Sequence, residues 1–129
     1  MSIKQKIAQD QILSAIQKKF EAQTEGLERA EILAKFEAQT RKGLEKYGQT
    51  VANNNLSAVE WIDHASEELI DYIVYLECLK AKLSQMISED VLVAILLIDI
   101  QLIDQAIEEV IVQIVYLEGL KAGLLKYES

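Results

Sequence analysis

The sequence contains no proline, the residue that most often ends helices or stiffens loops. Glycine is also scarce, with 5 among 129 residues, whereas Ala, Leu, Ile, Glu, Lys and Gln dominate. Such a composition favours long helices and leaves few turns. We therefore expect an all-α protein of the four-helix-bundle type, formed as one domain by residues 1–129.

Basic residues are few. The chain has 13 Lys and Arg against 21 Asp and Glu, which gives a formal net charge of −8. A protein that binds the nucleic-acid backbone needs a basic surface, so this balance argues against a nucleic-acid partner. A nucleotide remains compatible with it, because a metal ion can bridge acidic side chains to phosphates.

The chain has only one cysteine and no long hydrophobic run. Cys78 alone cannot form an internal disulfide and suits a reducing compartment; we expect it to be a small buried residue. The longest apolar run, Val91–Ile98, is too short to span a bilayer, and the polar segment Met1–Asp10 is no signal peptide. These features predict a soluble cytoplasmic protein with no membrane partner.

Two helices are predicted in residues 3–47. The first, residues 3–24, repeats apolar residues on one stripe, and the second, residues 27–47, does the same. The stripes consist of Ile7, Ile12, Ile16 and Phe20 in the first segment and of Ile32, Leu33, Phe36 and Leu44 in the second. Thr24-Glu25-Gly26 is the expected break, with one continuous helix as the alternative. Gly48 follows the second helix, as glycine often does.

Two further helices are predicted in residues 57–127. Ser57 and Glu60 form a capping-box pattern that opens a helix to about Ser84. Ser88-Glu89-Asp90 resembles another N-cap, which opens a helix to about Tyr127. The stretch 91–98 is apolar nearly all round, which predicts deep burial or a homo-oligomer interface. Its β-branched residues leave a strand as the competing interpretation.

The chain is internally repeated. Glu60–Leu83 aligns without a gap with Gln101–Leu124, and Lys19–Thr24 recurs as Lys35–Thr40. We name the four predicted helices A′ (residues 3–24), A (27–47), B (57–84) and B′ (the last helix, to about residue 127), so their order is A′-A-loop-B-B′. We interpret A and B as a helical hairpin, to which the helices of a former partner were joined at both ends to give a pseudo-symmetric bundle. A natural duplication and an engineered chain both remain open.

The two copies of the principal repeat differ at positions that carry chemistry. His64 corresponds to Gln105, and Asp71 corresponds to Val112. A valine at that position predicts that Asp71 points inward, where an unpaired charge would be costly. The remaining differences include Tyr72 against Gln113 and Trp61 against Leu102.

Carboxylates cluster on the predicted helix B. Glu68 and Asp71 are three residues apart and Glu67 and Asp71 four, so they share one surface of the helix. Two carboxylates at this spacing can share Mg²⁺, which prefers oxygen ligands and keeps waters for a phosphate substrate. The alternative is a solvated acidic surface without a ligand.

The segment Glu67–Leu76, EELIDYIVYL, resembles the second metal motif of the MazG-like all-α nucleotide pyrophosphohydrolases, E-E-L-x-D-x-x-x-Y-L. Residues 41–48 and 61–65 resemble small phage-encoded relatives of that group. The resemblance implies a Mg²⁺-dependent cleavage of nucleoside triphosphates between the α and β phosphates. It assigns metal binding to Glu68 and Asp71, with Glu67 beside them. On helix A, Glu37 and Glu45 are the carboxylates that we expect to approach from across. The family's first acidic motif, ExxE, is absent at the expected distance upstream.

Other residues complete the candidate site. His64 and Glu67 are the catalytic candidates, with His64 as a general base or a hydrogen-bond partner. Arg41, Lys42 and Lys46 could hold phosphates, and Tyr47 and Trp61 could stack a base. Each has a structural alternative, namely a solvated surface for the cations and the rim of the core for the aromatics. Tyr75 and Tyr116 occur in both copies, which predicts a packing role.

Two functions follow from the sequence. The first is a helical scaffold or interaction protein, natural or engineered, derived from a MazG-like segment. The second is a Mg²⁺-dependent nucleotide pyrophosphohydrolase with one site on helices A and B. The missing first acidic motif and the altered second copy favour the scaffold.

Overall fold

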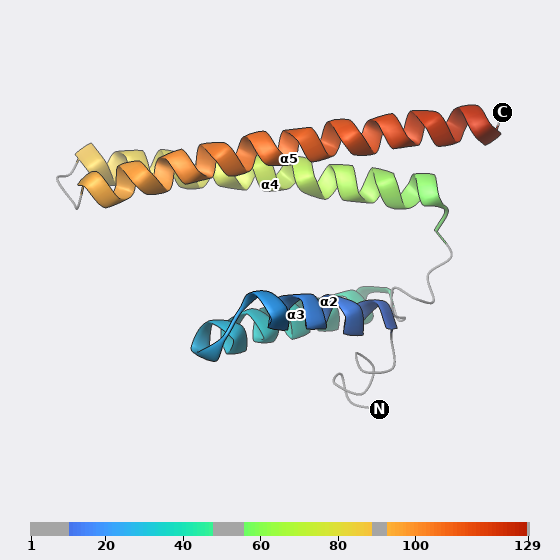
Figure 1. The fold of residues 1–129 in the computed structure, drawn as a ribbon, viewed down its shortest axis with the longest axis horizontal. Coiled ribbons are helices and arrows are strands. Elements are labelled where there is room, and N and C mark those ends of the chain that lie inside the picture. Colours follow the sequence, from blue (N-terminus) through green and yellow to red (C-terminus); the bar gives the residue numbers. More distant parts are fainter. Residues whose placement is uncertain (1–10, 48–55, 89–92, 129) are drawn as a thin grey trace. The chain divides into compact units, whose positions relative to one another are not determined.

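The computed structural model describes residues 11–47, 56–88 and 93–128. They form four helices in chain order, labelled in Figure 1: α2 (Gln11–Gln23), α3 (Gly26–Tyr47), α4 (Ala58–Ser88) and α5 (Val93–Glu128). The all-α prediction is confirmed. The chain divides into two units, residues 1–55 and 56–129, and each unit contains one pair of helices. The predicted hairpin would pair helix A, which is α3 in the first unit, with helix B, which is α4 in the second. This pairing stays a prediction.

The break between α2 and α3 lies where the sequence predicts it, so the single continuous helix is wrong. Gly26 has a φ of 59°, in the left-handed region that glycine adopts most easily. The Arg29 guanidinium donates hydrogen bonds to the backbone carbonyls of Glu21 and Thr24. These carbonyls lie at the C-terminal end of α2, so Arg29 satisfies acceptors that the helix itself leaves open.

The repeated hexapeptide KFEAQT shows how context decides a helix end. In both copies the threonine hydroxyl donates to the phenylalanine carbonyl four residues earlier, from Thr24 to Phe20 at 2.6 Å and from Thr40 to Phe36 at 2.9 Å. The first copy ends α2, whereas the second lies inside α3. The two phenylalanine rings pack at 5.5 Å between centroids and join α2 to α3.

One pair of glycine substitutions tests this break. Gly26→Ala should lower the free energy of unfolding by about 1 kcal/mol, because a Cβ disfavours positive φ. Gly43 lies inside α3 with open space where a Cβ would project, so Gly43→Ala should raise stability by about 0.5–1 kcal/mol. Urea unfolding of both variants measures the two effects; equal shifts would contradict the assigned break.

Helix α4 begins at the predicted capping box. The amide of Glu60 donates to the Ser57 hydroxyl at 3.1 Å, and the amide of Ser57 donates to the Glu60 carboxylate at 3.2 Å. The helix continues to Ser88, four residues beyond the prediction. The predicted cap at 88–90 falls largely outside the described residues. From Val93 onward the apolar stretch is helical, so the strand interpretation is wrong there.

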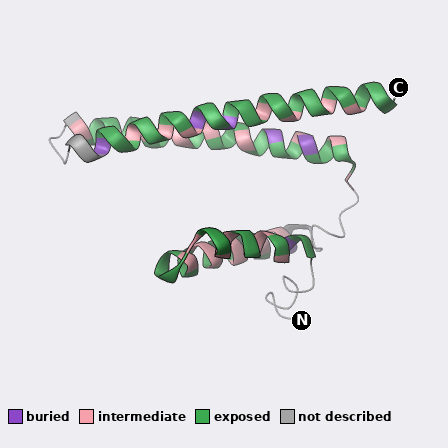
Figure 2. Ribbon diagram, in the orientation of Figure 1, coloured by how far each residue is buried: buried purple, intermediate pink, exposed green. Residues whose placement is uncertain are grey.

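Helices α4 and α5 pack along one heptad seam. Their less exposed residues recur at alternating spacings of three and four, which is the pattern of a coiled coil. Figure 2 shows the buried positions along the two facing helices. The seam consists of Val59, Ile62, Ser66, Leu69, Ile73, Leu76, Lys80, Leu83 and Ile87 on α4, and of Leu96, Ile100, Ile103, Ile107, Val110, Ile114, Leu117, Lys121 and Leu124 on α5.

Two equivalent ion pairs relate the copies in space. Lys121 binds Asp63 with an N–O distance of 2.6 Å, and Lys80 binds Asp104 at 2.9 Å. Glu60 aligns with Gln101, an offset of 41 positions, and the same offset converts one ion pair into the other. The α4–α5 pair is therefore pseudo-two-fold symmetric. The duplication read from the sequence is expressed as a symmetric pair of antiparallel helices (Figure 1).

The ion pairs give the pair of helices a pH dependence. The hydrogen bond to Asp63 raises the pKa of Lys121 above its ordinary value of 10.5, and the bond to Asp104 raises that of Lys80. A raised lysine pKa stabilises the fold fully below 10.5, and the contribution is lost as the pH rises through the folded value. The unmodified chain should therefore be more stable than a Lys80→Gln/Lys121→Gln variant at neutral pH, and this difference in stability should shrink toward about pH 12. Thermal unfolding across this range measures it, with the exposed Lys82→Gln as control; a constant gain would contradict the assignment.

The first unit corrects one detail of the predicted stripes. Ile12 is exposed, whereas its neighbour Leu13 is buried. Ile16, Phe20, Ile32, Leu33 and Phe36 are half-buried and Leu44 is buried, as the spacing predicts. Ile7 lies outside the described residues. The seam of α2 is thus displaced by one residue at its start, because Leu13 and Ile12 are both apolar and the pattern alone does not choose between them.

Candidate functional site

The polar candidates of helix B all lie on the exposed surface of α4. His64, Glu67, Glu68 and Asp71 are each exposed. His64 and Asp71 are seven residues apart, so they share one line along the helix, and the heptad places this line opposite the seam. Glu67 and Glu68 flank the line on its two sides. The four residues therefore lie on one outward strip of α4, where Asp71 is one turn from both Glu67 and Glu68.

The prediction that Asp71 points inward is wrong. Asp71 is exposed, and the corresponding Val112 in α5 is 67% exposed. Both residues lie on the side of their helix away from the seam. The exchange of aspartate for valine therefore reflects tolerance of an outer position, and it gives no sign of a buried carboxylate in the α4–α5 pair.

Glu67 lies near the interhelical ion pair of Lys121. The pKa of Lys121 is raised mainly by its bond to Asp63, and Glu118 and Glu67 contribute through their charges. Glu67 thus faces a lysine that Asp63 already binds. Its copy, Glu108, occupies the equivalent position in α5. Both copies keep the glutamate, but Glu108 makes no equivalent contribution at Lys80, whose pKa is raised by Asp104 and Glu77.

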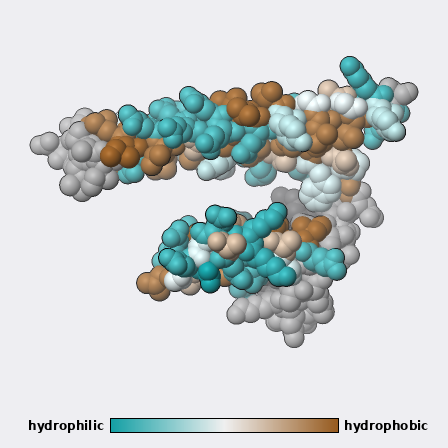
Figure 3. Space-filling view, in the orientation of Figure 1, coloured by the Kyte–Doolittle hydropathy of each residue, from teal (hydrophilic) through white to brown (hydrophobic). Residues whose placement is uncertain are grey.

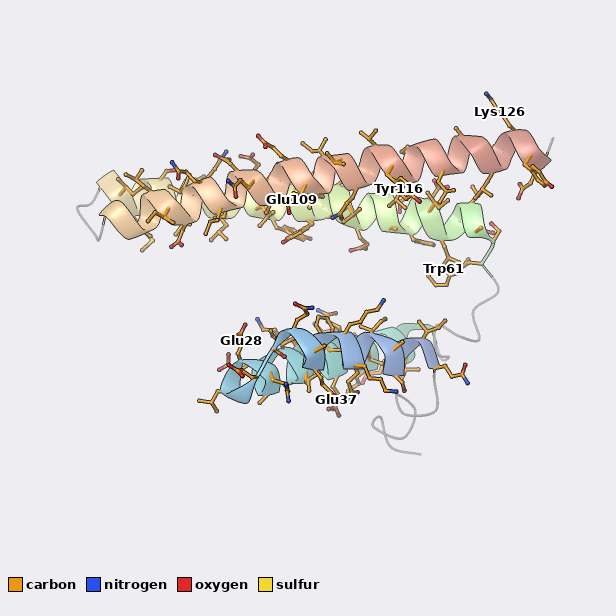
Figure 4. All side chains as sticks on the ribbon, viewed as in Figure 1. Glu28, Glu37, Trp61, Glu109, Tyr116 and Lys126 are labelled. Carbon is orange, nitrogen blue, oxygen red and sulfur yellow. The ribbon has the colours of Figure 1, made fainter. Side chains whose placement is uncertain are left out.

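Trp61 and His64 contact each other on α4. Their ring centroids are 6.2 Å apart with an interplanar angle of 58°, and Trp61 is 39% exposed. Figure 4 shows the Trp61 side chain near the N-terminal end of α4. A tilted indole beside an imidazole is a stable local contact for two residues one turn apart. The contact does not test the predicted roles of Trp61 in base stacking and of His64 as a general base, which stay predictions.

The candidates on helix A belong to the other unit. On α3, Glu37 is half-buried, while Arg41, Lys42 and Glu45 are exposed. The side chains of Lys46 and Tyr47 lie outside the described part of the chain. The predicted cage combines these residues with Glu68 and Asp71, which lie in the second unit. It therefore stays a prediction.

The described residues offer Mg²⁺ no ready set of ligands. Among them, no three His, Cys, Asp or Glu side chains come together closely enough to hold a metal ion. Mg²⁺ demands octahedral oxygen coordination and usually takes one or two carboxylates together with waters and phosphate. The carboxylates of α4 fit such a site only if oxygen donors from outside α4 complete it.

A second set of exposed residues was not predicted from the sequence. Tyr75 and Tyr116 are each 68% exposed, so within the α4–α5 pair their predicted packing role is wrong. Cys78, expected to be buried, is also exposed, because it lies opposite the seam. The two tyrosines belong to a further stripe of large side chains on one flank of the seam, which we call the aromatic face. It consists of Trp61, Tyr72, Tyr75, Leu79 and Met86 of α4 and of Leu102, Tyr116 and Leu120 of α5.

A signal in the sequence could have revealed the aromatic face. Its positions on α4 recur at the same alternating spacings as the seam, but in another register, and the aligned positions of α5 do likewise. The charged residues in this register are Glu68, Lys82, Asp99 and Glu109. Figure 3 shows hydrophobic patches along the α4–α5 pair, whereas the visible side of α2 and α3 is mostly hydrophilic.

Comparisons with known proteins give no further identification, because no family model, curated protein or solved structure matches this chain. Among the described helices, none is both long and apolar enough to cross a membrane.

Proposed function

We propose that this chain is a helical scaffold or interaction protein that acts through the exposed apolar surface of α4 and α5. One observation carries the proposal. In the described residues of these two helices, seventeen large hydrophobic side chains are exposed and four are buried. Large exposed apolar patches mark interaction sites in folded proteins, and Figure 3 shows such patches along the α4–α5 pair.

The arrangement of the acidic residues supports the same proposal. Glu67 and Glu68 recur in the second copy as Glu108 and Glu109, and Asp71 is exposed on the outer surface. All four glutamates are exposed to solvent, as expected for a polar outer surface of each helix. The resemblance of Glu67–Leu76 to a MazG-like motif then records the ancestry of the segment rather than a retained activity.

The alternative is a Mg²⁺-dependent nucleotide pyrophosphohydrolase. It is favoured by the exposure of His64, Glu68 and Asp71, which leaves them open to donors from α3 or from another chain. Glu68 and Asp71 would hold the ion together with waters, phosphate or such donors, for which Glu37 and Glu45 are the candidates on α3. We prefer the scaffold because the described residues bring no third side-chain ligand to this pair.

Calorimetric titration with Mg²⁺ separates the two functions. The unmodified chain and Asp71→Val, which copies Val112, are compared, together with pyrophosphate release from a nucleoside triphosphate. The scaffold predicts that Asp71→Val changes neither the heat of binding nor the release. Stoichiometric Mg²⁺ binding that Asp71→Val abolishes, with pyrophosphate release by the unmodified chain alone, would overturn it.

A further inference from the structure

We propose that the partner covering the aromatic face is a second copy of this chain, so that two α4–α5 pairs form a four-helix bundle. The proposal rests on the interaction function proposed above and names its partner. It uses the aromatic face, whose eight residues are between 39% and 68% exposed within one chain.

The position of the aromatic face fits such a bundle. The seam occupies two of the seven heptad positions, and the aromatic face occupies two others on one side of it. The centre of the face is therefore roughly 100° from the centre of the seam about the helix axis. In a four-helix bundle each helix packs against two neighbours that lie roughly at right angles. The seam is the contact of each helix with its first neighbour. The aromatic face lies in the direction of the second neighbour.

The opposite flank of the seam is less suited to a partner. It carries the ion pairs of Lys80 with Asp104 and of Lys121 with Asp63, whose side chains remain between 28% and 50% exposed. Covering them would remove charged groups from water, which is costly. The same flank exposes Ile70, Val74, Ile111 and Val115, but a partner there would have to cover both ion pairs. The charged residues in the register of the aromatic face are Glu68, Lys82, Asp99 and Glu109, and none of them forms an ion pair among the described residues.

The area of the aromatic face matches a specific interface. The exposed parts of its eight side chains amount to roughly 900 Å² per copy, close to the ~800 Å² that each partner buries in a standard interface. The repeat places Tyr75 and Leu79 of α4 and their copies, Tyr116 and Leu120 of α5, in the aromatic face. In a two-fold dimer both partners would contribute this face to the interface.

The other pair of helices in the same chain is a poor occupant. In the described part of α2 and α3, the exposed large hydrophobic residues are Ile12 and Leu27. The helices have 13 and 22 residues, or roughly 20 and 33 Å, against roughly 46 Å for the 31 residues of α4. In their described residues they expose little apolar surface toward any partner, whereas a second α4–α5 pair exposes the whole aromatic face.

Sedimentation equilibrium of the full chain tests the proposal. The unmodified chain should have twice the mass of one chain, which is 14.6 kDa, at micromolar concentrations. The variant Tyr75→Lys/Tyr116→Lys places charges on the aromatic face and should sediment as a monomer, with at least a tenfold weaker association. The matched control is Val74→Lys/Val115→Lys, which changes adjacent exposed residues by the same charge on the other flank and should remain dimeric.

Each outcome decides the proposal. A monomeric unmodified chain overturns it, and a control variant that dissociates while the tyrosine variant stays dimeric overturns the choice of face. Circular dichroism of every variant confirms that the helices persist. A monomer that shows no Asp71-dependent Mg²⁺ binding would reject the second copy and leave the scaffold function standing, whereas Asp71-dependent binding would reject the scaffold whatever the mass.

Discussion

Val110→Asp should unfold the α4–α5 pair under conditions in which the unmodified chain is stable. Val110 is 6% exposed and lies in the seam against α4. An aspartate there would bury a carboxylate without a partner or displace the helix, at a cost of about 3–5 kcal/mol. The midpoint of thermal unfolding should fall by at least about 12 °C. Circular dichroism at the helical band measures the loss.

The control for this prediction lies two residues away. Val112 is 67% exposed, and the other copy has Asp71 at the same position, so Val112→Asp should change stability by less than about 0.5 kcal/mol. The two variants make the same chemical change on the same helix. Similar losses in both would show that the heptad seam is misplaced, because burial alone distinguishes the two sites.

Ser66→Ile should stabilise the chain by about 1–2 kcal/mol, and Ile107→Ser should destabilise it by about 3 kcal/mol. Ser66 is 4% exposed, and its hydroxyl has no hydrogen-bond partner in the described residues. The corresponding residue in α5 is Ile107, 7% exposed. The pseudo-two-fold relation makes the two positions equivalent, because Ser66 precedes Lys80 and Ile107 precedes Lys121 by the same number of residues, and the two lysines form equivalent ion pairs.

The asymmetry between these two variants tests the pseudo-symmetry itself. If the copies are equivalent in space, the space around Ser66 accommodates an isoleucine as readily as the space around Ile107 does. Urea unfolding gives both free energies. A loss of stability in Ser66→Ile would show that the seam near Ser66 is tighter than its copy, and the equivalence of the two ion pairs would then not extend to the core.

Local signals in the sequence predicted much of the fold. The capping box at Ser57 and Glu60 and the break at Gly26 depend on a few neighbouring residues, and both are present in the structure. The repeat predicted a pseudo-symmetric arrangement, which the two ion pairs express between α4 and α5. Helix ends that lack such signals were predicted less accurately. Helix α4 continues to Ser88 because its sequence has no residue that stops a helix at Ser84.

The outward or inward direction of single residues was harder to predict. On α4 both the seam and the aromatic face consist largely of apolar residues in heptad registers, so hydropathy does not say which stripe meets α5. The wrong inward assignments of Asp71 and Cys78 follow from this ambiguity. The ion pair between Lys121 and Asp63 resolves it, because a contact between helices fixes the register that a pattern within one helix leaves open.

The candidate metal site was predictable only in part. The cluster of Glu67, Glu68 and Asp71 follows from helical spacing, and its exposure on α4 is a property of one helix. The carboxylates expected from Glu37 and Glu45 depend on how two units come together. No local pattern encodes that arrangement, whereas the titration with Asp71→Val tests the part of the site on α4.

The fluorescence of Trp61 tests the central claim most directly, because it is the only tryptophan and lies on the aromatic face. Its quenching by acrylamide is measured while the unmodified chain is diluted. We predict that quenching increases on dilution, as the dimer dissociates and exposes the indole of each copy. Quenching that stays constant at every concentration, with the mass of a single chain throughout, would contradict self-association through this face.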